Sequence, residues 1–357
     1  MPPLVEELVP APDPVRSCER LDGLPYRLLL DSAIADARLG RYSFLTADPV
    51  AVVRSKGGEV ECLDLVTSTR RTERGDPLAV LRALVEPYST PAVAGLPPFQ
   101  GGVAGYVAYD WGLTLERLPA PRYDDLALPD VVMAVYDWVL AWDHASGQAW
   151  LISTGLPETT PSARASRAVM RAAAVKERIR HAHASPLPPA PLPPASSHPP
   201  AFAASRLRRG KRPFAPSHLV QPVWWPASLQ LKSSFTRDAY LAAVERVREY
   251  VFAGDIFQAN LSQRFEAPFH QPAWDFYRCL RERNAAPFAA YLDFPEAQIV
   301  SASPERFLRV DAARHVETRP IKGTRPRGVG PEHDAALGQA LAESAKDRAE
   351  NLMIVDL

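Results

Sequence analysis

The chain has 357 residues, of which 46% are hydrophobic and 23% are charged, and its formal net charge is zero. This length predicts about two domains, and the composition is typical of a globular protein. A zero net charge gives no indication of a nucleic-acid or acidic-membrane partner, and no apolar run is long enough to span a bilayer. The first residues lack the basic start and apolar run of a signal peptide.

Cysteine usage indicates a reducing compartment. The three cysteines, Cys18, Cys62 and Cys279, are odd in number and far apart in the chain. This spacing argues against a disulfide framework or a zinc site, and it predicts a cytoplasmic location.

The first part of the chain predicts strands and short helices. A helix is expected over 76–85, because Asp76 and Pro77 precede an amphipathic pattern. The glycine-rich stretch 98–106 lacks the lysine of a phosphate loop and the spacing of a dinucleotide-binding fingerprint, so it predicts close backbone packing. Strands are predicted at 26–32, 41–45, 50–53, 131–142 and 149–153, the last two as an antiparallel pair.

A proline-rich segment separates two predicted domains. After an alanine- and arginine-rich helix expected over 162–184, residues 186–200 hold eight prolines among fifteen residues. Such a composition cannot build a packed core and is typical of an extended linker, although a partner-binding proline motif is an alternative. The predicted division is an N-terminal domain at 1–184, a linker at 185–229 and a second domain at 230–357.

The second domain has clearer signals. Thr236 can cap a helix that ends at Gly254. Residues 255–265 alternate between apolar and polar side chains, which predicts a strand, and 299–310 predict another strand interrupted at 303–305. A last helix is expected from Glu332 to the final residue.

A basic loop carries the strongest chemical signal. Residues 317–328, ETRPIKGTRPRG, follow a short strand-like run and place three arginines within five residues of Lys322. Crowded cations disfavour a protonated amine, so Lys322 is a candidate nucleophile, and the arginines could hold a substrate with several carboxylates. Gly323 would let the backbone approach a ligand. The alternative is an ordinary solvated basic loop.

Carboxylates of the last helix are candidate metal ligands. Glu343, Asp347 and Glu350 share one face of the predicted helix, and the apolar residues 352–355 follow directly. A helix that is apolar near its end is buried, so carboxylates near its start need a partner, and hard carboxylate oxygens suit Mg²⁺. A solvated acidic face is the alternative.

Four ordered motifs resemble the chorismate-utilising enzymes, the family of anthranilate, aminodeoxychorismate, isochorismate and salicylate synthases. The motifs are 254–262 (GDIFQANLS), 303–307 (SPERF), 319–325 (RPIKGTR) and 346–357 (KDRAENLMIVDL). The stretch 99–110 also resembles the N-terminal part of members that work with an amidotransferase. The resemblance implies an α+β fold like that of anthranilate synthase component I, with antiparallel sheets packed as a sandwich and flanking helices.

Two positions distinguish the members of this family. Members that add water tend to carry lysine at the position of Gln258, whereas those that add ammonia carry glutamine. Anthranilate synthases usually have alanine where this chain has Lys322. The resemblance therefore implies aminodeoxychorismate synthase component I, which supplies 4-aminobenzoate and folate synthesis. Anthranilate synthase component I is the alternative.

The resemblance also implies a mechanism. Lys322 attacks C2 of the ring while the C4 hydroxyl leaves with proton transfer from Glu305, and ammonia then enters at C4 and expels the lysine. Mg²⁺ holds the ring carboxylate, with Glu350 as a ligand and Asp347 nearby. Substrate contacts are implied for Gln258, Gly323 and Thr324. Taken without the family, Glu305 and Gln258 would be ordinary polar residues.

A partner and an effector are also implied. None of the three cysteines lies in a glycine-flanked elbow suited to a glutaminase nucleophile, so ammonia is expected from a separate glutamine amidotransferase subunit. Some relatives hold tryptophan in an N-terminal pocket, which here would be lined by Ser32, Tyr42, Ser43 and Phe44. Asp31 replaces the glutamate of that pocket, which puts feedback inhibition in question and leaves a structural tryptophan open.

The family pattern continues beyond Leu357. The expected Gly-Ser/Thr-x-Thr-Gly-Ala-Pro-Lys segment, the remaining metal carboxylates and a substrate arginine are absent from the sequence. We therefore expect the chain to be C-terminally truncated and, by itself, inactive. A non-catalytic scaffold that docks the amidotransferase is a further alternative.

Overall fold

The computed structural model describes residues 2–34, 39–89, 91–119, 121, 124–180 and 230–355. The predicted linker at 185–229 lies outside these residues. The chain forms two compact units, and each of them combines residues from before and after the predicted linker. The first unit comprises Met1–Val107, Val131–Pro194 and Ala273–Leu357, and the second comprises Ala108–Asp130 and Ala195–Pro272.

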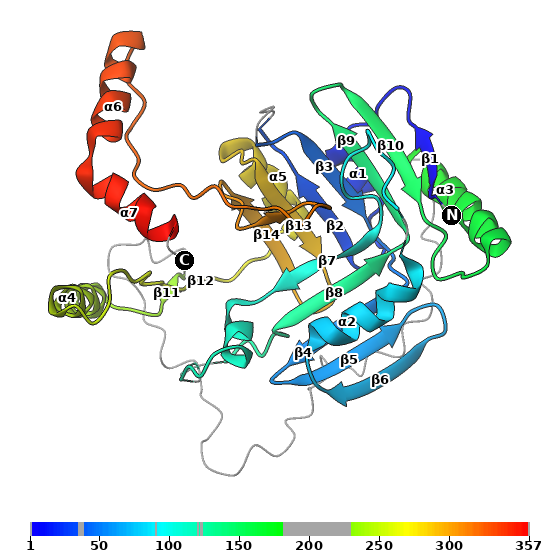
Figure 1. The fold of residues 1–357 in the computed structure, drawn as a ribbon, viewed down its shortest axis with the longest axis horizontal. Helices are drawn as coiled ribbons and strands as arrows, with labels where there is room; N and C mark the ends of the chain where they lie inside the picture. The colour runs from blue at the N-terminus through cyan, green and yellow to red at the C-terminus, as the bar shows by residue number, and fades with distance from the viewer. Residues whose placement is uncertain are drawn as a thin grey trace. The chain divides into compact units, whose positions relative to one another are not determined.

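Two antiparallel sheets form the frame of the first unit (Figure 1). The seven-stranded sheet has the order β1 (Leu4–Glu7), β10 (Gln148–Ser153), β9 (Trp138–Asp143), β3 (Tyr42–Thr46), β2 (Arg27–Asp31), β13 (Phe288–Asp293) and β14 (Gln298–Ser303). The five-stranded sheet has the order β6 (Thr69–Arg74), β5 (Glu59–Asp64), β4 (Ala51–Lys56), β8 (Val131–Tyr136) and β7 (Gly102–Val107). The expected α+β class with antiparallel sheets is confirmed.

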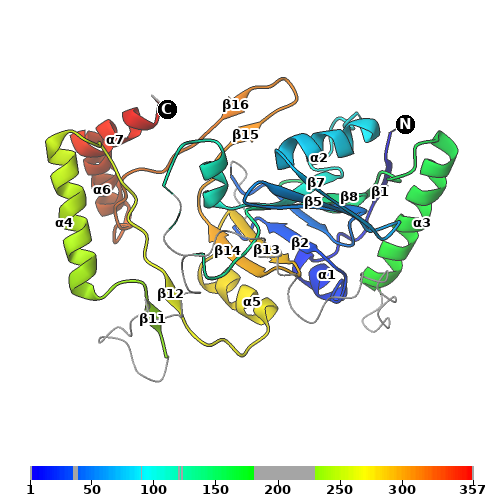
Figure 2. The same ribbon diagram turned by 90° about the horizontal axis from the view of Figure 1, so that it is seen from below.

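Helices and one small hairpin complete the first unit. Figure 2 shows α2 lying along the five-stranded sheet, where it contacts β4 and β8. The helical elements are α1 (Pro14–Arg20), α2 (Pro77–Val85), η1 (Glu86–Tyr88), α3 (Pro161–Arg180), α5 (Ala273–Arg283), α6 (Pro331–Glu343) and α7 (Ala345–Val355). The hairpin consists of β15 (Arg309–Val310) and β16 (Val316–Glu317).

The core follows from side-chain alternation along the strands. Leu29 on β2 and Tyr291 on β13 are paired and pack with α1, α3 and α5 on one face of the seven-stranded sheet. Their neighbours Leu28 and Leu292 pack on the other face, against side chains of β4, β5 and β8. Because successive strand residues point to opposite faces, the seven-stranded sheet is buried on both sides, between helices and the second sheet.

The second unit contains fewer elements. They are η2 (Tyr109–Thr114), β11 (Lys232–Ser233), α4 (Arg237–Ala253) and β12 (Phe265–Glu266). The predicted helix with a Thr236 cap is confirmed: the Thr236 hydroxyl accepts from the Ala239 amide at 3.1 Å, and Gly254 ends α4 with φ +80°.

Two predicted strands differ from the structure. The predicted strand 131–142 is two strands, β8 and β9, which turn at the buried Asp137 and enter different sheets. The predicted strand 255–265 has no regular structure before its last residue, and Phe257 is 60% exposed. Phe265, together with Glu266, forms the short strand β12, which pairs with β11. Alternation without a partner strand leaves backbone groups unpaired and does not make a strand.

The predicted helix from Glu332 to the end of the chain is divided. Ser344 has φ −63° and ψ 109°, which ends α6, and its side-chain oxygen accepts from the Asp347 amide at 3.3 Å at the start of α7. Glu343 therefore belongs to α6, whereas Asp347 and Glu350 belong to α7. The acidic stripe of three residues on a single helix was wrong.

Close packing at the glycine-rich stretch is confirmed. A Cβ built on Gly105 of β7 would lie 1.9 Å from the Val132 carbonyl oxygen of β8, so only glycine fits there. Within the residues that the structure describes, no helix is both long enough and apolar enough to cross a membrane.

Candidate functional site

The β15–β16 hairpin positions the loop that carries Lys322. Arg309 pairs with Glu317 and Val310 with Val316, and the Thr318 hydroxyl donates to the Phe307 carbonyl at 3.0 Å. An ion pair between Arg306 and Glu317 joins the same two segments. The SPERF motif and the basic loop, separate in sequence, are therefore held together at the base of this hairpin.

Glu305 lies in a turn at the end of β14. The Ser303 hydroxyl donates to the Glu305 carbonyl at 2.9 Å and accepts from its amide at 3.4 Å. The Glu305 side chain is exposed, Lys322 is half-buried, and neither forms an ion pair with any residue that the structure describes. The arrangement leaves both groups open to a ligand.

Gly323 brings the loop against α7. Its φ is +69°, a conformation that favours glycine, and a Cβ at this position would lie 2.5 Å from Cγ of Asp347 and 2.8 Å from its Oδ1. Any larger residue would collide with the carboxylate. The residue next to the candidate nucleophile is therefore in direct contact with a candidate metal ligand.

The three arginines of the loop are each matched to a carboxylate. Arg319 Nη2 lies 2.9 Å from Glu317, Arg325 Nη2 lies 3.1 Å from Asp347 Oδ2, and Arg327 pairs with Asp334. The loop is thus not a concentration of unpaired positive charge, contrary to the sequence expectation.

These contacts lower the pKa values of the carboxyls. The pKa of Glu317 is lowered mainly by its hydrogen bond with Arg319, and that of Asp334 by the Gly328 amide and then Arg327. Hydrogen bonding with Ser344, and then with Arg325, lowers the pKa of Asp347. The carboxylates are therefore ionised at neutral pH.

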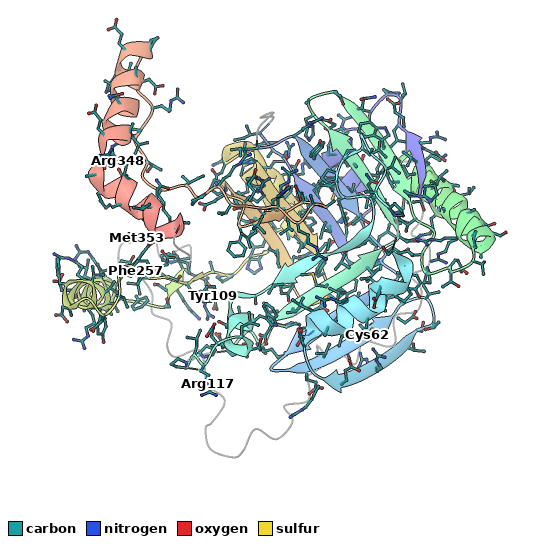
Figure 3. The ribbon with its side chains drawn as sticks, in the orientation of Figure 1. Cys62, Tyr109, Arg117, Phe257, Arg348 and Met353 are labelled. Carbon is teal, nitrogen blue, oxygen red and sulfur yellow. The ribbon has the colours of Figure 1, made fainter. Side chains whose placement is uncertain are left out.

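Asp347 and Glu350 are candidate ligands of a hard cation. They lie one turn apart on α7, on which Arg348 and Met353 are labelled in Figure 3. Asp347 is 6% exposed, and Glu350 is half-buried with no hydrogen-bond partner among the described residues. Mg²⁺ is often bound by one or two carboxylates plus water and substrate oxygens, so this pair fits a magnesium ion. No larger group of candidate metal ligands occurs in the described part of the chain.

Gln258 belongs to the second compact unit, in the irregular segment that follows α4. It is half-buried, and Thr324 in the first unit is exposed. The implied substrate contacts of Gln258, Gly323 and Thr324 stay predictions.

The structure brings together the residues of the predicted tryptophan pocket. The Ser32 hydroxyl lies 2.6 Å from the Tyr42 carbonyl and 3.3 Å from the Pro287 carbonyl, and the Ser32 amide donates to Ser43 Oγ at 3.0 Å. Ser43 Oγ also lies 2.7 Å from His144 Nε2. These polar groups thus lie together in the seven-stranded sheet, where β2 ends and β3 begins.

Sequence reasoning missed the buried partners of Asp31. Its carboxylate, which is shielded from solvent, accepts from the Tyr277 hydroxyl at 3.0 Å, from Ser43 at 3.1 Å and from Arg281. Phe44 forms an edge contact with Phe99 at 5.8 Å. Tyr277 and Arg281 are more than 240 positions from Asp31, and no local pattern could have linked them.

A separate cavity of about 490 Å³ lies in the first unit beside α2 and η1. Its lining includes Arg82, Tyr88, Gln100 and Leu156 but none of the predicted site residues.

Comparisons with known proteins identify the family of the chain. Residues 30–357 match the model of the chorismate binding enzyme family. Aminodeoxychorismate synthase component 1 of Escherichia coli is 33% identical over 345 residues, covering 95% of this chain and 63% of the relative. Anthranilate synthase component 1 of Thermus thermophilus is 35% identical over 335 residues, covering 93% of this chain and 62% of the relative.

A solved structure shows the same fold. Anthranilate synthase component I from Streptococcus pneumoniae aligns with a TM-score of 0.63 and 26% sequence identity, covering 90% of this chain and 61% of that one. The chain thus spans somewhat less than two thirds of the length of these relatives. The hairpin that carries the lysine loop, the family match and the fold agree: the chain belongs to the chorismate binding enzyme family.

Proposed function

We propose that the protein carrying this chain is component I of an aminodeoxychorismate synthase, which converts chorismate and ammonia to 4-amino-4-deoxychorismate. The observation that carries the proposal is Lys322, a half-buried amine beside a glycine that contacts the Asp347 carboxylate. In this proposal the lysine next to that contact acts on the ring whose carboxylate Asp347 would help to anchor. The Escherichia coli relative of that name is 33% identical to this chain, which is compatible with the proposal.

In the proposed reaction, the Lys322 amine bonds to C2 of the ring as the C4 hydroxyl leaves. Glu305, at the turn after β14, donates the proton that departs with this hydroxyl as water. Ammonia then bonds to C4, and the bond between Lys322 and C2 breaks to restore the amine. Two displacements of moderate difficulty replace one that is harder.

Magnesium and a second subunit complete the proposal. Asp347 and Glu350 would hold Mg²⁺, which when bound neutralises the negative charge of the ring carboxylate. A separate glutamine amidotransferase would supply ammonia. Among the cysteines of the chain, Cys18 is buried and burial raises the pKa of its thiol to about 12, so Cys18 is unsuited to act as a nucleophile. Binding of tryptophan by Ser32, Tyr42, Ser43 and Phe44 is also proposed, and calorimetric titration with tryptophan tests it.

The second candidate is anthranilate synthase component I. The Thermus thermophilus relative, which carries that name, is 35% identical to this chain, so overall similarity does not favour either activity. The lysine at position 322 decides our choice between them.

The product distinguishes the two candidates. The full-length protein is incubated with chorismate, an ammonium salt and Mg²⁺, and the products are separated by chromatography. We expect 4-amino-4-deoxychorismate without release of pyruvate, whereas anthranilate with pyruvate would contradict the proposal. Lys322→Ala should slow the reaction by about 10²-fold or more, since it removes the nucleophile. An unchanged rate in this variant would exclude the covalent role.

A further inference from the structure

One carboxylate stands out in the part of the chain that carries the motifs. Among residues 301–354, all of which the structure describes, Asp347 is the one residue that is buried. A buried carboxylate needs a counter-charge, because its ionised form is costly to remove from water. In this structure Arg325 supplies that charge, with its Nη2 atom 3.1 Å from Asp347 Oδ2.

The two oxygens of the Asp347 carboxylate have different neighbours. Oδ1 packs against Gly323, since it lies only 2.8 Å from where a Cβ on that glycine would be. The other carboxylate oxygen, Oδ2, is the one that Arg325 contacts. A divalent cation that binds Oδ2 would meet the guanidinium at the same oxygen, and the two positive charges would repel each other.

Among the residues that the structure describes, Arg325 has no side-chain partner other than Asp347. Its other contact is between Nη1 and the carbonyl of the adjacent Thr324, at 2.8 Å. The neighbouring Arg327 is held differently, because it makes two hydrogen bonds to Asp334, which lies on α6. Of these two arginines, Arg325 is the one that contacts a candidate metal ligand.

We propose that Arg325 is a positioning residue, a counter-ion of Asp347, and that a divalent cation binds by displacing it. Arg325 would hold the carboxylate ionised and aimed at the loop until the cation arrives. It would also weaken binding of the cation in the absence of substrate. The inference rests on the proposed function, in which Asp347 helps to hold Mg²⁺.

The test measures metal affinity rather than activity. Mn²⁺ is titrated into the full-length protein without chorismate, and binding is followed by calorimetry and by the electron paramagnetic resonance of free Mn²⁺. We expect Arg325→Gln to bind Mn²⁺ about threefold to tenfold more tightly than the unaltered protein, the range expected when a competing ion pair is removed. Arg325→Lys keeps the positive charge, so it should bind Mn²⁺ as weakly as the unaltered protein does.

Arg327→Gln is the matched control, since it removes the same charge from the same loop but from a different carboxylate. Its Mn²⁺ affinity should equal that of the unaltered protein. Equal or weaker binding by Arg325→Gln would overturn the proposal, and so would an equal gain in Arg327→Gln, which would indicate a general field effect.

A measurement on the unaltered protein covers the case in which Arg325→Gln does not fold. Nitrogen-15 spectra of the arginine side chains are recorded during titration with Mg²⁺. The signal of Arg325, assigned as the one missing in Arg325→Lys, should move on saturation while that of Arg327 stays. An unmoved Arg325 signal at saturating Mg²⁺ would contradict displacement.

Failure of the proposed function would look different. If the protein makes anthranilate, the assigned reaction is wrong but the affinity difference can stand. If Mn²⁺ and Mg²⁺ do not bind the unaltered protein at all, the metal role of Asp347 and this inference both fall, whichever product is formed.

Discussion

Two of the buried aspartates with arginine partners, Asp137 and Asp347, differ in their electrostatic situation. Asp137, fully buried at the turn from β8 to β9, is paired with Arg171 of α3 at 3.0 Å, and Arg171 also contacts Asp48. Asp347 at the start of α7 has one ion-pair partner among the described residues, Arg325. Burial raises the pKa of Asp137 despite its arginine, whereas hydrogen bonding with Ser344 and then Arg325 lowers the pKa of Asp347.

The difference separates a structural ion pair from an exchangeable one. The Arg171 guanidinium joins α3 to the turn between the two sheets, and its removal would leave the buried Asp137 with the more distant Arg167, whose Nε lies 3.7 Å away, as its counter-charge. The Arg325 side chain lies on a loop and is 35% exposed, and the proposal above is that a cation replaces it. Similar chemistry thus stabilises the fold at one site and leaves room for a ligand at the other.

The largest expected effect lies at the structural pair. Arg171→Met should lower the free energy of unfolding by about 3–5 kcal/mol, the cost of breaking a buried ion pair. Urea unfolding followed by circular dichroism measures it. Arg246→Met, which breaks an exposed pair on α4, is the control and should leave the transition unchanged. A similarly small effect of both variants would remove the distinction between the two kinds of pair.

The next largest effect is expected at alkaline pH, which should lower the free energy of unfolding of the first unit. Burial raises the pKa of Cys18 to about 12 from a usual value of 9.0, so the folded thiol keeps its proton while the unfolded thiol loses it. This contribution to stability is complete below pH 9 and is lost as the pH rises toward 12, at about 1.4 kcal/mol per pH unit.

The pH dependence of urea unfolding between pH 8 and 11 tests this expectation. Cys18→Ala should flatten the fall in stability by about one proton equivalent, because the ionising thiol is gone. Cys279→Ala, in which an exposed thiol is removed, should keep the original slope. Identical slopes in all three proteins would show that Cys18 does not contribute.

A smaller effect is expected at the loop glycine. Gly323→Ala introduces left-handed strain of about 1–2 kcal/mol, and its Cβ would also collide with Asp347. Gly330→Ala is the matched control, because Gly330 has φ +89° but no atom within 4 Å of the added Cβ. We expect both variants to lose stability in urea and only Gly323→Ala to lose Mn²⁺ affinity. An equal loss of Mn²⁺ affinity in both variants would attribute that loss to backbone strain rather than to the collision with Asp347.

The smallest expected effect is that of Arg325→Gln on stability. Because the guanidinium is partly exposed and its loop is otherwise held by the hairpin contacts, the urea midpoint should not shift measurably. A shift as large as that of Arg171→Met would make Arg325 a structural residue and would remove the contrast between the two aspartates.

Local signals predicted much of this fold. The caps at Thr236 and Asp76 fixed the starts of two helices, and Asp76 Oδ1 does accept from the Leu78 amide at 2.9 Å. The glycine-rich stretch correctly indicated close packing at Gly105. Such features depend on residues within one turn or one strand, which a sequence pattern can specify.

Long-range pairing could not be predicted in the same way. Strand β13 lies between β2 and β14, although about 260 residues separate Leu29 from its partner Tyr291. Nor does alternation show that a polar residue such as Asp137 will be buried at a turn between sheets. Both facts depend on which faces meet in the folded chain.

The order of the motifs and the identity of Lys322, Gln258 and Glu305 are fixed by the sequence alone, and they determined which family to consider. The tertiary structure decided that Asp347 is buried, that Gly323 contacts it and that Arg325 neutralises it. The reason is physical: a motif specifies which groups are present, but burial and charge pairing arise only when distant segments pack together.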